Sequence, residues 1–228
     1  MGVLGGMGPH ATVDFFGLLV RLTPADKDWN HLHIIVDNNP RIPSRTRAYL
    51  YDEASPISYM IEGARRLEGM GAGVIVVPCN SASHFLADVR AAVKATVLDP
   101  VGSTSEHIVR EGTTRRPLVL GGMVTHRAEL YAHALAARGV VPVRPTDTEQ
   151  HEVAALIEAL KKLDTSPAVV QRTLALIEAG MTRGADSAIL GCTEFGLIAD
   201  ELARVARVPI YNSNELLARA TLRLAWRE

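Results

Sequence analysis

The chain has 228 residues, of which 47% are hydrophobic, 21% charged and 5% aromatic. Its 24 lysines and arginines nearly balance 25 aspartates and glutamates, so the formal net charge is only −1. This balance provides no basic surface for nucleic acid or membrane, and no apolar run reaches the roughly 18 residues that a bilayer requires. The length allows one large domain or two domains of about 100 residues each.

Two features of the sequence bear on where the protein works. The two cysteines, Cys79 and Cys192, are too few for a disulfide scaffold in a chain of this size. The first residues, Met1–Gly6, lack the charged region and long apolar core of a secretory signal. We therefore expect a cytoplasmic protein with reduced thiols that binds a small molecule and neither nucleic acid nor a membrane.

The first half of the chain alternates between predicted strands and helices. A short strand starting at Val3 enters the glycine-rich turn Gly5–Pro9, and the two prolines and two asparagines of Asn38–Ser44 indicate a loop. Further strands are expected over residues 33–37 and 74–78, and helices over residues 11–22, 58–70 and 82–95. This alternation is the signature of a parallel sheet that is covered by helices on both faces.

The pattern of the first half then starts again. The Val-Leu-Gly-Gly-Met sequence at Val3 recurs at Val119, 116 residues later, and each valine has a histidine seven residues after it. Cys192 follows Cys79 by 113 residues, and each cysteine comes eight residues after a Gly-Ala pair. Two independent matches at nearly the same offset predict a duplicated α/β unit, with two similar lobes related by a pseudo-twofold axis.

The second half contains further alternating elements. Helices are expected over residues 128–137, 149–163, 167–182 and 215–226, and strands over residues 140–143, 187–191 and 208–211. We expect the last strand and helix to return to the first lobe, because they follow a complete second repeat. The first lobe would then comprise residues 1–98 and 208–228, and the second residues 99–207.

Each cysteine directly follows a predicted strand. Ligands of open α/β sheets bind beyond the carboxyl ends of the strands, so two facing lobes would place one thiol on each wall of a cleft. Paired thiols suit a reaction that removes a proton from one face of a carbon and delivers one to the other face. A free thiol has a pKa of about 8.5, and a helix N-terminus behind each cysteine can assist its ionisation.

Simpler interpretations stay open at this point. A lone buried cysteine is usually a small hydrophobic residue, and a redox pair is possible although no C-x-x-C motif is present. A metal site is less well supported, because only His84 lies near a cysteine. The glycine turn can either approach a substrate carboxylate or be a plain tight turn, and Arg45 can hold a carboxylate.

Four motifs in order resemble the aspartate/glutamate racemase family, and specifically its aspartate racemase branch. They are GGMGPHAT (Gly5–Thr12), DNNPRIPSRT (Asp37–Thr46), PCNSA (Pro78–Ala82) and GCTE (Gly191–Glu194). The resemblance covers essentially the whole chain. It implies two Rossmann-like lobes with the active site in the cleft between them, frequent homodimers, and racemisation without pyridoxal phosphate or another cofactor.

The resemblance also implies roles for individual residues. Cys79 and Cys192 would exchange the α-proton of an amino acid in a two-base reaction. Substrate binding is expected from Met7, Gly8, Asp37, Arg45, Asn80, Ser81, Thr125, Thr193, Glu194 and a lysine after the second-lobe helix, which we place at Lys162 with Lys161 as the alternative.

Three departures from the family pattern, Ser83, Gly122 and Asn212, leave the choice of substrate open. The leading hypothesis is racemisation of aspartate, glutamate or a relative. A cis–trans isomerase or a decarboxylase of a small dicarboxylate is an alternative, although decarboxylation needs only one protonating thiol. A non-catalytic ligand-binding relic is a further alternative, for which two preserved cysteines would be unnecessary.

Overall fold

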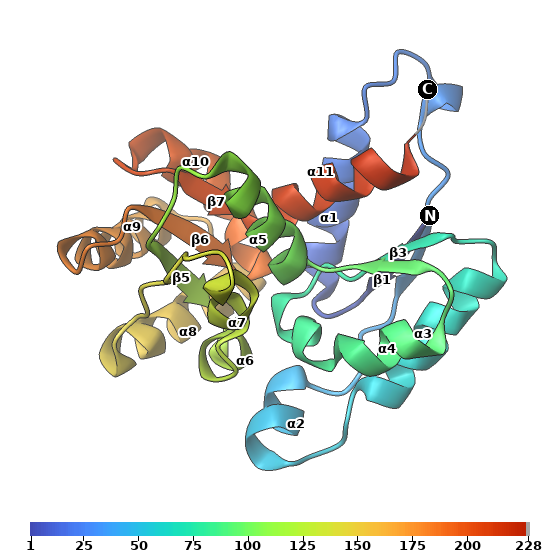
Figure 1. The fold of residues 1–228 in the computed structure, drawn as a ribbon, viewed down its shortest axis with the longest axis horizontal. Coiled ribbons are helices and arrows are strands. Elements are labelled where there is room, and N and C mark those ends of the chain that lie inside the picture. Colours follow the sequence, from blue (N-terminus) through green and yellow to red (C-terminus); the bar gives the residue numbers. More distant parts are fainter. Residues whose placement is uncertain (227–228) are drawn as a thin grey trace. The chain divides into compact units, whose positions relative to one another are not determined.

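The computed structural model describes residues 1–226 and contains two compact units (Figure 1). One unit comprises Met1–Pro100 together with the chain from Asn214 onward, and the other comprises Val101–Ser213. Each unit holds a parallel sheet flanked by helices, which confirms the predicted α/β fold class. Within the described residues, no helix is both long and apolar enough to cross a membrane.

The first unit is built on a four-stranded parallel sheet in the order β2-β1-β3-β4. Its strands are β1 (Gly2–Gly5), β2 (Ile35–Asn38), β3 (Val74–Val76) and β4 (Thr96–Leu98). Its helices are α1 (Pro9–Leu22), α2 (Arg45–Tyr51), α3 (Ile57–Gly69), α4 (Leu86–Ala92) and α11 (Ser213–Ala225), with 3₁₀ segments η1 (Asp28–Asn30) and η2 (Asn80–Phe85).

Successive residues of β1 face opposite sides of this sheet, as the period of a strand requires. Val3 packs with Phe15 of α1 and Leu217 of α11, whereas Leu4 packs with Met60 of α3. Figure 1 shows α1 and α11 on one side of these strands and α3 and α4 on the other. Burial on both faces explains why the strands read as continuous apolar runs in the sequence.

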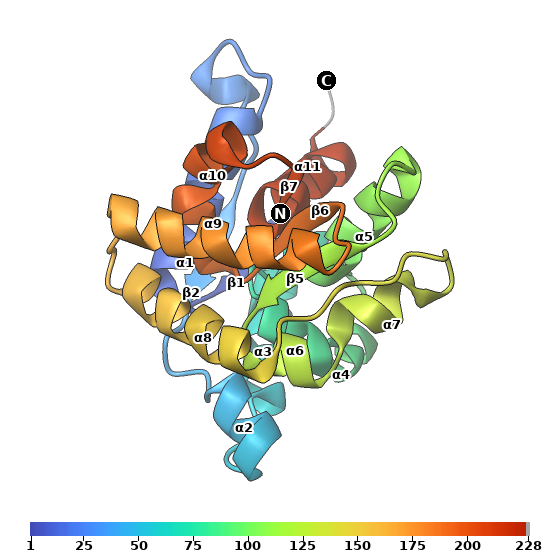
Figure 2. The same cartoon turned by 90° about the vertical axis from the view of Figure 1, so that its left-hand side faces the viewer.

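The second unit is built on a three-stranded parallel sheet in the order β5-β6-β7. Its strands are β5 (Pro117–Gly121), β6 (Ser187–Gly191) and β7 (Ile210–Asn212). Its helices are α5 (Pro100–Glu111), α6 (Met123–Arg127), α7 (Leu130–Ala136), α8 (Asp147–Lys161), α9 (Pro167–Thr182) and α10 (Ala199–Val205), with the 3₁₀ segment η3 (Thr193–Ile198). Helices α8 and α9 lie side by side (Figure 2).

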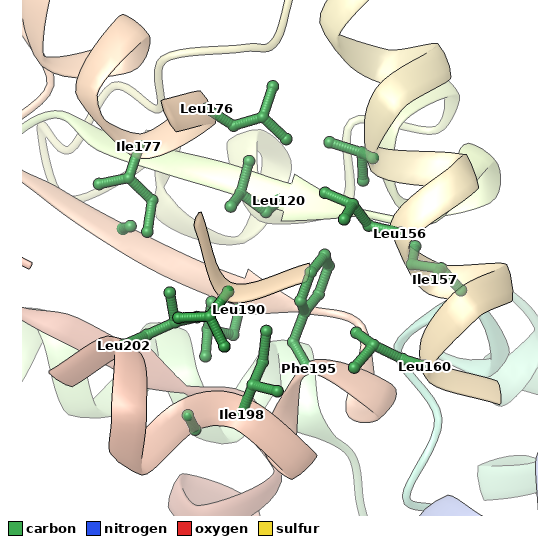
Figure 3. Packing of buried hydrophobic residues seen from close by; sticks show 14 of the residues in the cluster. Leu120, Leu156, Ile157, Leu160, Leu176, Ile177, Leu190, Phe195, Ile198 and Leu202 are labelled. Carbon is green, nitrogen blue, oxygen red and sulfur yellow. The ribbon is translucent and has the colours of Figure 1, made fainter. Parts of the chain in front are cut away.

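The core of the second unit fixes the segment that follows β6. Phe195 of η3 is fully buried, and Figure 3 shows its ring in the middle of a cluster that includes Leu160, Leu190 and Ile198. Burying an aromatic side chain of this size stabilises a fold by about 2–3 kcal/mol relative to exposing it. The residues just before Phe195 are therefore held against α8 by the packing of η3.

The predicted return of strand 208–211 to the first lobe is wrong. The observed strand β7 pairs with β6, with Ala188 opposite Ile210 and Leu190 opposite Asn212. The Ser213 hydroxyl donates a hydrogen bond to the Leu190 carbonyl at 2.7 Å, which ties the end of β7 to the same sheet. Only the last helix belongs to the first unit, and residues 227 and 228 of the predicted lobe lie outside the described part of the chain.

Two local predictions also need correction. The helix predicted over residues 128–137 is shorter than expected and corresponds to α7 alone, which begins after Glu129, a residue with a left-handed backbone and φ of +48° that separates α7 from α6. The predicted strand over residues 140–143 forms a single parallel bridge, between Leu118 and Val143. Helix α2 was not predicted, because it follows directly on the proline-rich loop.

Candidate active site

Cys79 lies at the carboxyl end of β3, an interior strand of the first sheet. It is the residue that precedes η2, its backbone is extended with φ of −156°, and 5% of its surface is exposed. Its N–H donates to the Val77 carbonyl at 2.7 Å, and its carbonyl accepts from the Ala82 N–H at 3.2 Å. Asn80 is buried beside it, so the first unit presents a thiol and an amide side chain at one sheet edge.

The glycine turn follows β1, which is the neighbour of β3, so it lies at the same edge of the sheet. Gly6 has φ of +88°, and a Cβ there would lie only 2.3 Å from the carbonyl carbon of Asn39. The Thr12 hydroxyl accepts from the Gly6 N–H and donates to the Gly8 carbonyl, both at 2.9 Å. The turn therefore needs glycine at Gly6, and Thr12 fixes its shape.

Arg45 is directed at this turn rather than at open solvent. Its guanidinium donates to the carbonyls of Ile42 at 3.3 Å, Pro43 at 3.0 Å and Met7 at 3.1 Å. The Nε atom is buried and has no partner among the described residues. Arg45 thus joins the loop after β2 to the glycine turn, and it brings the predicted residues Met7 and Arg45 into direct contact.

Asp37 lies in an ion pair that the sequence did not indicate. Its carboxylate accepts a hydrogen bond from Arg66 of α3 at 2.8 Å. This bond raises the pKa of Arg66 above its ordinary value. Because its charge is already compensated, Asp37 is a weaker candidate for substrate binding than the residues at the ends of β1 and β3.

Cys192 occupies the equivalent place in the second unit. It follows β6, the middle strand of the second sheet, and precedes η3 with φ of −138°. Its Sγ donates a hydrogen bond to Glu194 Oε2 at 2.9 Å, and the Thr193 hydroxyl donates to the same oxygen at 3.3 Å. Thr193 and Glu194 are 3% and 6% exposed, so this carboxylate lies almost out of contact with water.

Of the two lysines considered for this site, Lys161 lies within electrostatic range of Glu194 and Cys192. Burial acts to lower the pKa of Lys161, but the ion pair with Glu158 and the negative charge of Glu194 raise it above the ordinary value, and Cys192 adds to this effect only when its thiol is ionised. Lys162 directly follows the last residue of α8, and both lysines are exposed. The electrostatic interaction favours Lys161, the stated alternative, over Lys162, because one residue turns a helical side chain by about 100°.

Thr125 lies in α6, just after β5, at the same sheet edge as Cys192. Its side chain is buried, and its hydroxyl has no partner among the described residues. Thr125 lines a small cavity of about 20 Å³ that also borders His126 and Arg144. Burial, followed by the charge of Arg144, lowers the pKa of His126, which favours its neutral form.

The three departures from the family pattern have defined positions. Ser83 lies in η2 and donates to Asp99 at 2.7 Å, and Asp99 is ion-paired with Arg90 at 2.5 Å. Gly122 precedes α6, and Asn212 ends β7. The Ser83–Asp99–Arg90 chain and Thr12 were not predicted as parts of the site, although a threonine shortly after a glycine-rich turn is a detectable signal.

Within residues 1–226, no three His, Cys, Asp or Glu side chains are grouped so that they could hold a metal ion.

Comparison with known proteins agrees with this geometry. The chain is 28% identical over 229 residues to the broad specificity amino-acid racemase RacX of Bacillus subtilis (strain 168), covering 97% of this chain and 96% of RacX. It is 27% identical to the Picrophilus torridus aspartate racemase structure, with a TM-score of 0.86 over 99% of this chain and 93% of that one. An aspartate racemase homologue from Pyrococcus horikoshii OT3 shares the fold, with 23% identity, a TM-score of 0.81 and coverage of 99% and 98%.

A family model matches nearly the whole chain. The model for Asp/Glu/Hydantoin racemase matches residues 4–221, which include both cysteines and all four sequence motifs. The match confirms the predicted family, and with the racemase relatives it supports the prediction of an isomerase. The chain belongs to the Asp/Glu/Hydantoin racemase family.

Proposed function

We propose that this protein racemises an amino acid without a cofactor, and that Cys79 and Cys192 transfer the α-proton. The observation that carries the proposal is the repeated placement of the thiols. In each unit a cysteine follows an interior strand of a parallel sheet and directly precedes a 3₁₀ segment. A cysteine with a purely structural role would not need to recur at this position in both units.

The proposed reaction conserves atoms and charge. One cysteine, as a thiolate, takes the proton from the α-carbon and becomes a thiol, while the electron pair stays on the substrate as a carbanion. The other cysteine, as a thiol, gives its proton to the opposite face of that carbon and becomes a thiolate. The reaction requires each thiol to reach the same carbon atom, and exchanging the two roles runs it in reverse.

The carbanion carries negative charge next to the substrate carboxylate, so the site must supply fixed hydrogen-bond donors. The first N–H groups of a helical segment have no acceptor within it, and those after Cys79 and Cys192 are candidates for this role. We propose that the substrate is bound by Met7, Gly8, Arg45, Asn80, Ser81, Thr125, Lys161 and Thr193. The cysteines and the glycine turn follow strands of their own units, whereas Arg45 begins α2 and Lys161 ends α8.

The choice of amino acid rests on the relatives. One is named an aspartate racemase and another a broad specificity amino-acid racemase, and their identities to this chain are nearly equal. Arg45 supplies a positive charge, but three of its N–H groups are hydrogen-bonded to backbone carbonyls. We therefore propose a substrate range that includes aspartate and extends beyond it. The homodimer and the cytoplasmic location remain predictions.

A panel of substrates tests the proposal. The purified protein is incubated without added cofactor with L-aspartate, L-glutamate and a set of neutral and basic L-amino acids, and D-isomers are measured by chiral chromatography. We expect a D-isomer from at least one of them, at a rate that a chelator and a carbonyl reagent that traps pyridoxal leave unchanged. Isomerisation or decarboxylation of a dicarboxylate, with no D-amino acid from the whole panel, would contradict it.

A further inference from the structure

The two cysteine segments differ in charge at the position two residues after the thiol. Cys79 is followed by Asn80 and Ser81, whereas Cys192 is followed by Thr193 and Glu194. The Glu194 carboxylate lies 2.9 Å from the Cys192 sulfur and is 6% exposed. The second unit therefore contains a buried acidic group in contact with its thiol, at a position where the first unit has a hydroxyl.

The hydrogen bond between Cys192 and Glu194 favours the protonated form of the thiol. An ionised carboxylate can only accept hydrogen bonds, so in the bond between sulfur and Oε2 the thiol must be the donor. The Thr193 hydroxyl donates to the same oxygen, which further satisfies its negative charge. Losing the thiol proton would leave two negative charges about 3 Å apart in surroundings with little water, which is unfavourable.

Lys161 is a cationic side chain that interacts electrostatically with this pair. Within the described residues, Glu194 forms no ion pair with a lysine or arginine, and Lys161 acts on it and on Cys192 only through space. Lys161 itself is paired with Glu158 at 2.7 Å, which offsets part of its charge. In the first unit the carboxylate beside η2 is Asp99, which is paired with Arg90 and hydrogen-bonded to Ser83 rather than to the thiol.

We propose that Glu194 is a positioning residue that holds Cys192 as a neutral thiol in the resting enzyme. Cys192 then donates the first proton, and Cys79 is left to act as the base. This assignment rests on the proposed two-base reaction, and it breaks the equivalence of the two units. After each turnover the Cys192 thiolate lies beside the Glu194 carboxylate, so it takes up a proton from water, and Cys79 releases the proton that it took from the substrate to water, before the next cycle in the same direction.

The pH dependence of thiol alkylation tests this assignment without requiring a known substrate. In a Cys79→Ser background, the rate at which iodoacetamide modifies Cys192 is measured by mass spectrometry between pH 6 and 10. With Glu194 present, we expect the midpoint of this profile to lie above the free-thiol value of about 8.5. Glu194→Gln removes the charge, so the midpoint should fall and the rate at pH 7 should rise about 3- to 10-fold.

Further variants distinguish the effect of a changed charge on the Cys192 midpoint from the effect of an altered structure. Lys161→Gln should shift the Cys192 midpoint in the opposite direction, because it removes a positive charge. Glu194→Asp keeps the charge and should retain a midpoint above that of Glu194→Gln. In a Cys192→Ser background, Glu194→Gln should shift the alkylation midpoint of Cys79 by less than it shifts that of Cys192, because the Glu194 carboxylate is in contact with Cys192.

Two results would overturn the assignment: a wild-type Cys192 midpoint at or below that of a free thiol, or a Glu194→Gln midpoint that is unchanged or higher. The first result needs no change at Glu194, so the test stands even if Glu194→Gln does not fold. Because alkylation does not depend on turnover, a negative substrate panel would count against the racemase proposal and not against the state of the thiol.

Discussion

Replacing either cysteine by serine is expected to lower the rate of racemisation by about 10²- to 10⁴-fold, the usual contribution of a positioned acid or base. A serine hydroxyl has nearly the size of a thiol, but it does not ionise near neutral pH. Cys79→Ser and Cys192→Ser should therefore each remove one half of the proton transfer. Chiral chromatography of the product, with the substrate found in the panel, measures the loss.

The two single variants should also differ in the enantiomer whose α-proton they exchange. A protein with one remaining thiol can still exchange the α-proton of the enantiomer whose hydrogen faces that thiol, and the two variants should favour opposite enantiomers. Thermal unfolding serves as the control, because Cys79 is 5% exposed and belongs to the hydrophobic core of the first unit. If either variant is folded and keeps full activity, the two-base assignment is incorrect.

Gly6→Ala is expected to be among the most damaging substitutions in the chain. Gly6 has φ of +88°, and its missing Cβ would overlap the Asn39 backbone, with the carbonyl carbon and oxygen both at 2.3 Å. The loop after β2 would have to move, which would disturb the Thr12 and Arg45 contacts to the turn. We expect a loss of about 3 kcal/mol or more in the free energy of unfolding, together with a loss of activity.

Gly71→Ala is the matched control for this prediction. Gly71 has almost the same backbone conformation, with φ of +91°, but no atom lies within 4 Å of the position of its missing Cβ. Alanine there should cost only the strain of the left-handed backbone, about 1 kcal/mol. Urea unfolding of both variants measures the difference, and equal losses would show that the contact with Asn39 is unimportant.

The positions of the thiols could be predicted because they depend on local sequence. Apolar runs that end at Pro78 and Gly191 mark the ends of two buried strands, and the repeated spacing shows that the two cysteines occupy equivalent places. The glycine turn was visible for the same reason. These features need only the period of a strand and the conformational preferences of glycine and proline.

The partners of the side chains could not be predicted in this way. Strand β7 joins the second sheet through pairing with β6, a long-range contact that the order of the repeats did not reveal. Asp37 pairs with Arg66, which is 29 residues away in the sequence. The choice between Lys161 and Lys162 depends on where α8 ends and which face its last turn presents. Such details depend on tertiary packing, and the spacing of residues in the sequence contains little information about that packing.

Deuterium incorporation during the first turnovers tests the two-base reaction most directly. Racemisation of the L-isomer in D₂O is stopped early, and both enantiomers are analysed by mass spectrometry. The account predicts that the D-isomer carries one deuterium at the α-carbon while the remaining L-isomer is still unlabelled, because different thiols remove and deliver the proton. Early D-isomer that retains the original hydrogen, or L-isomer labelled as fast as the D-isomer forms, would contradict it.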